Sequence, residues 1–208
     1  MMQRRRLIAA APLAACASLA LTGCDQVRQL FGSGAQASFH NTDITGASYA
    51  QKLALPDAEG KPRSLEEFRG KVVFVFFGFT HCPDICPTTM AELAQVKKLL
   101  GDDGAKLQGV FVSLDPERDT PELLRNYAQA FDPSFVALRG SPEQTAAAAR
   151  EFKIFYQKVP GKTPGSYTLD HSAGSFVFDQ KGQVRLYVRY GSEPQKLAED
   201  IRVLLKQA

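Results

Sequence analysis

The chain has 208 residues, with 25 Lys and Arg, 22 Asp and Glu, and four Cys. Its basic excess lies at the N-terminal end: residues 1–23 hold three Arg and no acidic residue, and the remainder carries 22 basic and 22 acidic residues. A surface that binds nucleic acid needs clustered Lys and Arg, so this balance argues against a nucleic-acid partner. About 185 residues are enough to bury a core without disulfide bonds.

The first 23 residues are predicted to be a signal peptide, which takes no part in the fold. Three Arg precede an apolar stretch at residues 7–21, which is shorter than the roughly 20 residues of a membrane span. Small residues then precede Cys24, a pattern that resembles the bacterial lipoprotein signal. We expect cleavage before Cys24 and lipid attachment to it. With Asp25 following, this indicates a domain in the periplasm, anchored to the inner membrane of a bacterial envelope; an ordinary signal peptide is the alternative.

Residues 24–40 are rich in Gly, Ser, Ala and Gln and predict a flexible tether. Residues 41–208 are predicted to form one domain, whose elements alternate between strand and helix. The expected elements are a strand at 53–56, a short helix at 64–68, a strand at 72–77, a helix at 88–100, a strand at 110–114, a helix at 121–131, a strand at 135–138, a helix at 142–152, a hairpin of 175–179 with 184–190, and a helix at 192–205.

Local signals support these elements. The run at 72–77 is continuously apolar, as in a strand buried on both faces. Thr120 before Pro121 and Ser141 before Pro142 are typical helix starts, and Ser64 has the capping-box spacing. The order predicts an α/β domain with a mixed central sheet flanked by helices. It looks like a thioredoxin-like fold with extra N-terminal strands and a hairpin insertion.

The two cysteines of the predicted domain lie four positions apart in the segment HCPDICP, at Cys82 and Cys86. A single pair of cysteines this close in sequence does not resemble the disulfide framework that stabilises some exported proteins. We therefore expect the pair to have a chemical role. Residues 83–85 are predicted to form a tight turn, with Pro87 as the first residue of the following helix. Cys86 then lies at the helix N-terminus, where the dipole and free amides lower thiol pKa values.

Two thiolates and the imidazole of His171 form a soft ligand set. Sulfur favours Cu(I), and the added nitrogen allows Cu(II) as well, whereas a structural zinc site usually has four protein ligands. The same thiols could instead cycle between dithiol and disulfide, since the spacing permits the 4.4–6.8 Å that a disulfide needs between Cα atoms. A peroxidase is less favoured, because Phe79 occupies the place of the threonine that such enzymes carry.

Several polar residues lie near these three in sequence. His81 adjoins Cys82 and is expected to face solvent or to tune its pKa. Asp170 could orient the imidazole of His171, as residues behind a metal ligand often do. Asp115 and Asp119 are expected to shape a turn and not to bind the metal.

The segments FGFTHCPDICPTTM, VFVSLDPERDTPELLRNYAQAF and LDHSAGSFVFD occur in this order and closely resemble the Sco/SenC family of thioredoxin-like copper chaperones. The resemblance implies copper ligands at Cys82, Cys86 and His171, and delivery to the binuclear copper centre of cytochrome c oxidase subunit II or another copper-receiving protein. A periplasmic copper donor could act upstream. Some relatives look like thiol:disulfide oxidoreductases that reduce such copper sites, which leaves open whether the protein is an enzyme.

Overall fold

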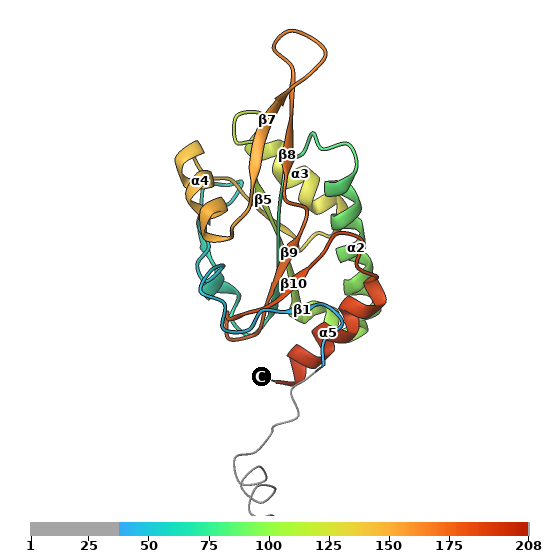
Figure 1. Cartoon of the computed structure of the whole chain (residues 1–208). Coiled ribbons are helices and arrows are strands. Elements are labelled where there is room, and N and C mark those ends of the chain that lie inside the picture. The colour runs from blue at the N-terminus through green and yellow to red at the C-terminus, as the bar shows by residue number, and fades with distance from the viewer. Residues whose placement is uncertain (1–37, 208) are drawn as a thin grey trace, which may run out of the picture. The chain divides into compact units, whose positions relative to one another are not determined.

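A computed structural model describes residues 38–207, and a compact unit starts at Phe39 (Figure 1). The predicted signal peptide, Cys24 and nearly all of the predicted tether lie outside the described residues. Within residues 38–207, no helix is both long enough and apolar enough to cross a bilayer.

The domain is built on a mixed sheet, as predicted, and this sheet has six strands. Strands β4, β5 and β6 run parallel, while β9 runs antiparallel to both β4 and β10, and β1 pairs antiparallel with β10. In spatial order the strands are β1 (Thr42–Asp43), β10 (Val184–Val188), β9 (Ser175–Phe178), β4 (Val72–Gly78), β5 (Leu107–Ser113) and β6 (Val136–Leu138).

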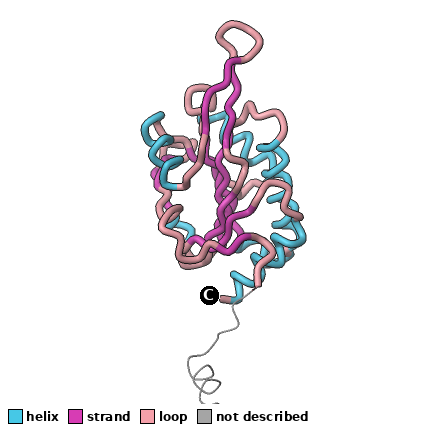
Figure 2. Tube along the Cα trace, viewed as in Figure 1, coloured by secondary structure: helices cyan, strands magenta, loops and turns pink. Residues whose placement is uncertain are grey.

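Helices cover both faces of this sheet (Figures 1 and 2). On one side α2 (Ile85–Leu99) packs against α5 (Pro194–Lys206), and α3 (Pro121–Phe131) packs against α2 and β6. On the opposite side lies α4 (Pro142–Glu151). Every residue of β4 and β5 is consequently buried, which explains why β4 is continuously apolar and does not alternate. Strand β5 also buries the polar residues Gln108 and Ser113.

Two predicted helix starts are confirmed. The hydroxyl of Thr120 accepts a hydrogen bond from Leu123 N at 3.2 Å at the start of α3. At α4, Ser141 and Gln144 form a complete capping box, in which each side chain bonds the backbone N–H of the other. These caps satisfy amides that have no partner within the first turn.

Three other starts differ from the prediction. The segment after Ser64 is a 3₁₀ helix, η1 (Leu65–Phe68), with no capping bond from the Ser64 side chain. Helix α2 begins at Ile85 and Pro87 is its third residue, which is tolerated because a first-turn proline lacks an N–H that the helix does not use. Helix α5 begins after Glu193, because the Ser192 hydroxyl instead donates to Asn41 Oδ1 at 2.8 Å.

A short 3₁₀ helix, η2 (Gly101–Lys106), and two small hairpins lie outside the main sheet. One hairpin joins β2 (Ala54–Pro56) to β3 (Pro62–Ser64), and the other joins β7 (Tyr156–Pro160) to β8 (Tyr167–His171). The predicted hairpin at 175–190 proves to be β9 and β10 of the main sheet. The β7–β8 hairpin was not predicted from sequence; it projects beyond the sheet in Figures 1 and 2 and ends at His171.

The N-terminal end of the described chain is fastened to α5 by a buried carboxylate. Asp200 accepts hydrogen bonds from the backbone N–H groups of His40 at 2.8 Å and Asn41 at 2.9 Å, and from the Asn41 side chain at 2.8 Å. These bonds lead the chain directly into β1, at the edge of the sheet.

Candidate metal centre

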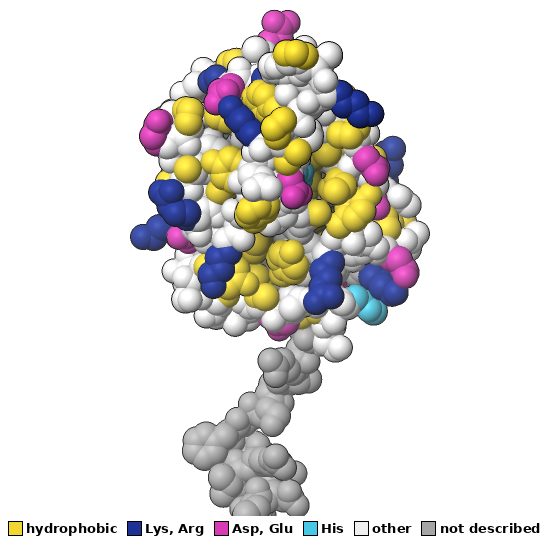
Figure 3. All heavy atoms as spheres, turned by 45° about the horizontal axis from the view of Figure 1, so that its top comes forward, with side chains coloured by type: hydrophobic (Ala, Val, Ile, Leu, Met, Phe, Trp, Pro, Cys, Tyr) yellow, Lys and Arg dark blue, Asp and Glu magenta, His cyan; other side chains and the backbone are white. Residues whose placement is uncertain are grey.

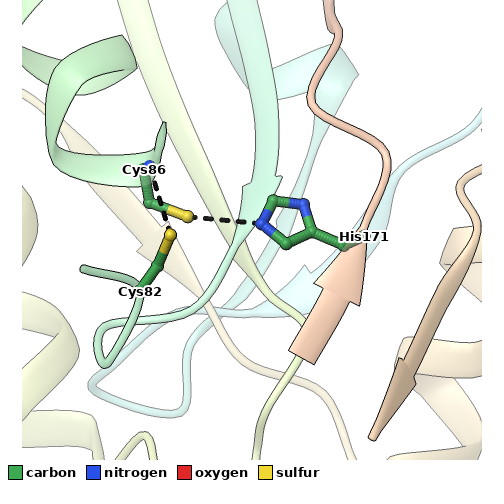
Figure 4. Close-up of side chains that lie close together, drawn as sticks. All are labelled: Cys82, Cys86 and His171. Carbon is green, nitrogen blue, oxygen red and sulfur yellow. Dashed lines mark hydrogen bonds between the residues drawn. The ribbon is translucent and has the colours of Figure 1, made fainter. Parts of the chain in front are cut away.

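Two neighbouring segments and a third that is distant in sequence bring Cys82, Cys86 and His171 together (Figure 4). Cys82 lies in the loop after β4, Cys86 in the first turn of α2, and His171 at the end of β8. Their ligand atoms all lie within 4.8 Å of one another, with Cys86 Sγ 3.5 Å from His171 Nε2. The predicted spatial proximity of the histidine to the thiol pair is therefore confirmed.

The imidazole of His171 is oriented by backbone and by aromatic rings. Its Nδ1 lies 2.9 Å from the carbonyl oxygen of Ser172. A carbonyl oxygen only accepts, so in the neutral ring Nδ1 carries the proton and the Nε2 lone pair faces Cys86. The edges of the rings of Phe79 and Phe76 pack near the imidazole, at centroid distances of 5.8 and 6.2 Å.

The two thiols differ strongly in their acidity. A hydrogen bond from the Cys86 thiol, aided by the backbone N–H groups of Asp84 and Cys86, lowers the pKa of Cys82 to about 5 although burial opposes this. Conversely, the hydrogen bond to Cys82 and its own burial raise the pKa of Cys86. Sequence analysis placed the helix N-terminal effect at Cys86. The structure directs it to Cys82, because the Cys86 N–H points to the Cys82 sulfur at 3.4 Å.

Gly78, the last residue of β4, makes room for the buried Cys86 sulfur. A Cβ atom built on Gly78 would lie 2.8 Å from Cys86 Sγ and 3.0 Å from the Phe111 ring. Real Cβ atoms essentially never approach another atom as closely as 2.8 Å, so a larger residue at this position requires the Cys86 sulfur to move. Sequence analysis did not give Gly78 a role; a glycine ending a buried strand is the signal that could have drawn attention to it.

Asp119 holds the cysteine loop in place. Its side chain is fully buried and accepts hydrogen bonds from Thr80 Oγ1 at 2.6 Å, from Thr80 N at 3.2 Å and from Ser113 Oγ at 2.5 Å. Burial raises its pKa, which these hydrogen bonds oppose. Asp119 was predicted only to shape a turn. It also fixes the cysteine loop, because Thr80 lies only two residues before Cys82.

The remaining candidates lie outside the thiol–imidazole group. His81 is exposed, with Nδ1 3.1 Å from the Thr80 hydroxyl, in line with its expected solvent-facing position. Asp170 is exposed and neighbours His171 on a strand, where successive side chains point to opposite faces. The Ser172 carbonyl, not Asp170, contacts the second ring nitrogen of His171.

The arrangement presents a thiolate, a thiol and an imidazole nitrogen to one point. Two sulfur donors and one nitrogen donor suit a thiophilic ion, copper above all, while fewer than four protein ligands leave such an ion open to a further ligand. Cys82 and Cys86 are not joined by a disulfide, and because their sulfurs lie within 4.8 Å of each other the pair is also able to form one.

These features define a thioredoxin-like domain with a Cys–Cys–His group. The sequence profile of the SCO1/SenC family matches residues 41–206. The chain therefore belongs to the SCO1/SenC family, as the sequence resemblance predicted.

Similar proteins come from bacteria and mitochondria. The mouse (Mus musculus) mitochondrial protein SCO2 homolog is 38% identical over 152 residues, which span 72% of this chain but only 60% of the mouse protein. The structure of Bradyrhizobium japonicum ScoI with copper bound is 36% identical, covers 74% of this chain and 97% of its own, and has a TM-score of 0.67. The solution structure of apo Sco1 from Thermus thermophilus is 41% identical, with corresponding coverages of 83% and 97% and a TM-score of 0.66.

The lowered pKa of Cys82 predicts its reactivity. Because thiolate is the reacting form, alkylation of Cys82 by iodoacetamide should be nearly independent of pH above about pH 6.5 and should fall as the pH drops through about 5. Peptide mapping by mass spectrometry should show Cys86 reacting more slowly. Cys86→Ala removes the largest cause of the shift, so the Cys82 profile should move to higher pH. A wild-type Cys82 rate that climbs roughly tenfold per pH unit up to about 8.5 would contradict the assignment.

The tight contact at Gly78 predicts a site-specific defect. Gly78→Ala should cost about 1–3 kcal/mol in the free energy of unfolding and should speed alkylation of Cys86 by displacing its sulfur. Gly109→Ala is a matched control, because its Cβ would lie 2.6 Å from Phe135, away from the thiols. It should destabilise the domain to a similar extent, as measured by urea unfolding, and leave Cys86 protected. Equal Cys86 reactivity in both variants would rule out this role for Gly78.

Proposed function

We propose that this protein is a copper metallochaperone, which binds one copper ion through Cys82, Cys86 and His171 and passes it to another protein. The observation that carries the proposal is the meeting of two sulfurs and one imidazole nitrogen within 4.8 Å. The copper-bound ScoI of B. japonicum, at 36% identity, supports copper as the cargo.

The protonation states on the three ligands favour uptake of copper. The Cys82 thiolate is available at neutral pH, and the Nε2 lone pair of His171 already faces the thiol pair. Cys86 must lose its proton when its sulfur binds copper, so uptake releases a proton and becomes stronger as pH rises. Sulfur ligation suits Cu(I), and the imidazole extends the range to Cu(II).

The proposed recipient is the binuclear copper centre of cytochrome c oxidase subunit II, or another copper-receiving protein, with a periplasmic donor upstream. Membership of the SCO1/SenC family supports this assignment. On the face drawn in Figure 3, Lys and Arg side chains are separated by acidic and apolar ones. Such a mixed surface suits docking to a protein better than binding to nucleic acid, which needs clustered basic residues.

We further propose that the domain is held at the bacterial envelope by a lipid on Cys24, on the inner membrane and facing the periplasm. The basis is the sequence pattern before Cys24. SCO2-like proteins from Rickettsia and a SCO1/SenC family lipoprotein from Bacillus anthracis are among the similar proteins, which accords with a location at a bacterial envelope.

The acidity of Cys82 favours a second candidate function, that of a thiol:disulfide oxidoreductase. The Cys82 thiolate would attack one sulfur of a client disulfide, and the other client sulfur would leave as thiolate. After losing its proton, Cys86 would attack Cys82 in the mixed disulfide and release the second client thiol. The client gains two electrons and the pair becomes a disulfide, so repeated turnover requires an added dithiol.

Copper titration of the reduced domain tests the main proposal. Wild type should bind one Cu(I), and Cys82→Ala or Cys86→Ala should weaken binding by more than about a hundredfold, because each removes a direct ligand. His171→Ala should weaken Cu(II) in the same way but Cu(I) by less than about tenfold, because two thiolates can hold Cu(I) alone. His40→Ala is the control and should leave both affinities unchanged, because His40 pairs with Glu199 and not with any residue of the site.

Absence of stoichiometric copper uptake by the reduced wild-type domain would refute the metallochaperone. A disulfide-reduction assay run beside the titration separates the two functions. Turnover with dithiothreitol that survives His171→Ala, without copper uptake, would identify the oxidoreductase instead.

The lipid anchor has its own test in bacterial cells. The wild-type chain should incorporate labelled palmitate and sediment with membranes, and Cys24→Ser should lose the label because the thioether-forming sulfur is gone. Cys16→Ser, within the predicted signal peptide, should retain it. Persistent labelling of Cys24→Ser would disprove lipidation at this residue.

A further inference from the structure

The β7–β8 hairpin carries one of the three ligand-type residues but is not part of the main sheet. Its strands pair only with each other, from Tyr156 opposite His171 to Pro160 opposite Tyr167. A two-stranded sheet is at best marginally stable in water. The position of His171 therefore depends on whatever fastens this hairpin to the body of the domain.

Arg118, in the turn between β5 and α3, makes several of these attachments. Its Nη1 donates to the carbonyl oxygen of Tyr167 at 2.7 Å, and its Nε donates to Asp115 at 2.5 Å. Its guanidinium carbon lies 3.7 Å from the centroid of the Tyr167 ring and 5.9 Å from that of Phe79. One side chain thus bonds the hairpin backbone, stacks on a hairpin ring and reaches an aromatic neighbour of His171.

The contact with Tyr167 bears directly on the direction of His171. Side chains two positions apart share a strand face, so Tyr167, the buried Leu169 and His171 lie on the same side of β8. The Tyr167 hydroxyl also donates to Asp115 at 2.8 Å. Fixing Tyr167 between Arg118 and Asp115 consequently sets the rotation of the strand that aims the imidazole.

The same turn also fixes the cysteine side of the site. Asp119, the next residue after Arg118, binds Thr80 in the cysteine loop. Residues 115–119 therefore hold both halves of the thiol–imidazole group: Asp119 holds the loop that bears Cys82, and Arg118 with Asp115 holds the strand that bears His171.

We propose that Arg118 is a positioning residue, which holds His171 against the thiol pair by clamping β8 to the turn at 115–119. This proposal rests on the proposed copper function for its consequence: Arg118 contributes chiefly to Cu(II) binding, because Cu(II) requires the imidazole while Cu(I) is held by the two sulfurs. Lysine cannot replace it, since an ammonium group lacks the planar fork that bonds two partners while it stacks on a ring.

The first test uses the metal-free domain. In Arg118→Lys, hydrogen exchange of the β7–β8 amides should become roughly tenfold faster, the effect expected for loss of about one net stabilising hydrogen bond. Amides of β4 and β5 should keep their wild-type rates. The matched control is Arg125→Lys, whose wild-type residue pairs with exposed Glu59 at 3.0 Å; it should leave all these amides unchanged. Unchanged hairpin exchange in Arg118→Lys would overturn the clamp, whatever the metal affinity.

The second test measures copper. Arg118→Lys should weaken Cu(II) by roughly 10–100-fold, as for other residues that orient a metal ligand, and alter the Cu(II) electron paramagnetic resonance spectrum. Its Cu(I) affinity should fall less than about threefold. Equal weakening of both ions, or unchanged Cu(II) binding, would overturn the positioning role. A wild-type domain that takes up no copper would refute the proposed function alone, because the exchange result stands independently.

A second variant guards against misfolding of Arg118→Lys. Tyr167→Phe keeps the stacked ring and removes only the hydroxyl bond to Asp115. It should shift hairpin exchange and Cu(II) affinity in the same direction by roughly two- to tenfold, the effect of one lost hydrogen bond. No shift in either quantity would count against the clamp.

Discussion

The buried carboxylate of Asp119 is the constraint on which the rest of the site depends. It connects the loop after β4 to the turn after β5 through three hydrogen bonds from Thr80 and Ser113, with no solvent to replace them. Loss of an acceptor at such a position leaves buried donors unsatisfied, which costs about 1–3 kcal/mol for each. The parallel pairing of β4 with β5 brings the two segments to the same end of the sheet, where α/β domains place their sites.

The two cysteine sulfurs differ in acidity because their surroundings differ. Cys82 is partly exposed and receives hydrogen bonds that favour thiolate, whereas Cys86 is buried between β4 and α2 and keeps its proton. The absence of a side chain at Gly78 makes this burial possible. The hydrogen bond between the two sulfurs, together with burial and nearby backbone N–H groups, thus gives two identical thiols different pKa values.

Much of this architecture could be predicted from sequence, because its signals are local. The apolar run of β4 and the caps at Thr120 and Ser141 correctly indicated a strand and two helices. The β7–β8 hairpin escaped prediction because β7 lacks the alternation that marks a half-buried strand, and the alternation of β8 extends over only five residues. The start of α2 was misplaced because proline is common at the first helical position, although any first-turn position accepts it.

The proximity of His171 to the thiols was predicted from the soft ligand set that the three residues would form, and the family resemblance implied the same residues; no local pattern links residues 85 positions apart. The contacts of Arg118 with Tyr167 join residues 49 positions apart. No sequence motif at either residue predicts that the two are in contact. Long-range partners of this kind are determined by the fold as a whole.

The three donor residues differ in their exposure, so the thiol–imidazole group has a solvent-exposed side and a buried side. Cys86 is fully enclosed, while Cys82 and His171 both reach solvent in part. For an ion held by all three atoms, an incoming ligand can approach only on the side of Cys82 and His171. In the proposed transfer of copper, the bonds from Cys82 and His171 would therefore be replaced first and the bond from Cys86 last, so that the ion would stay bound throughout.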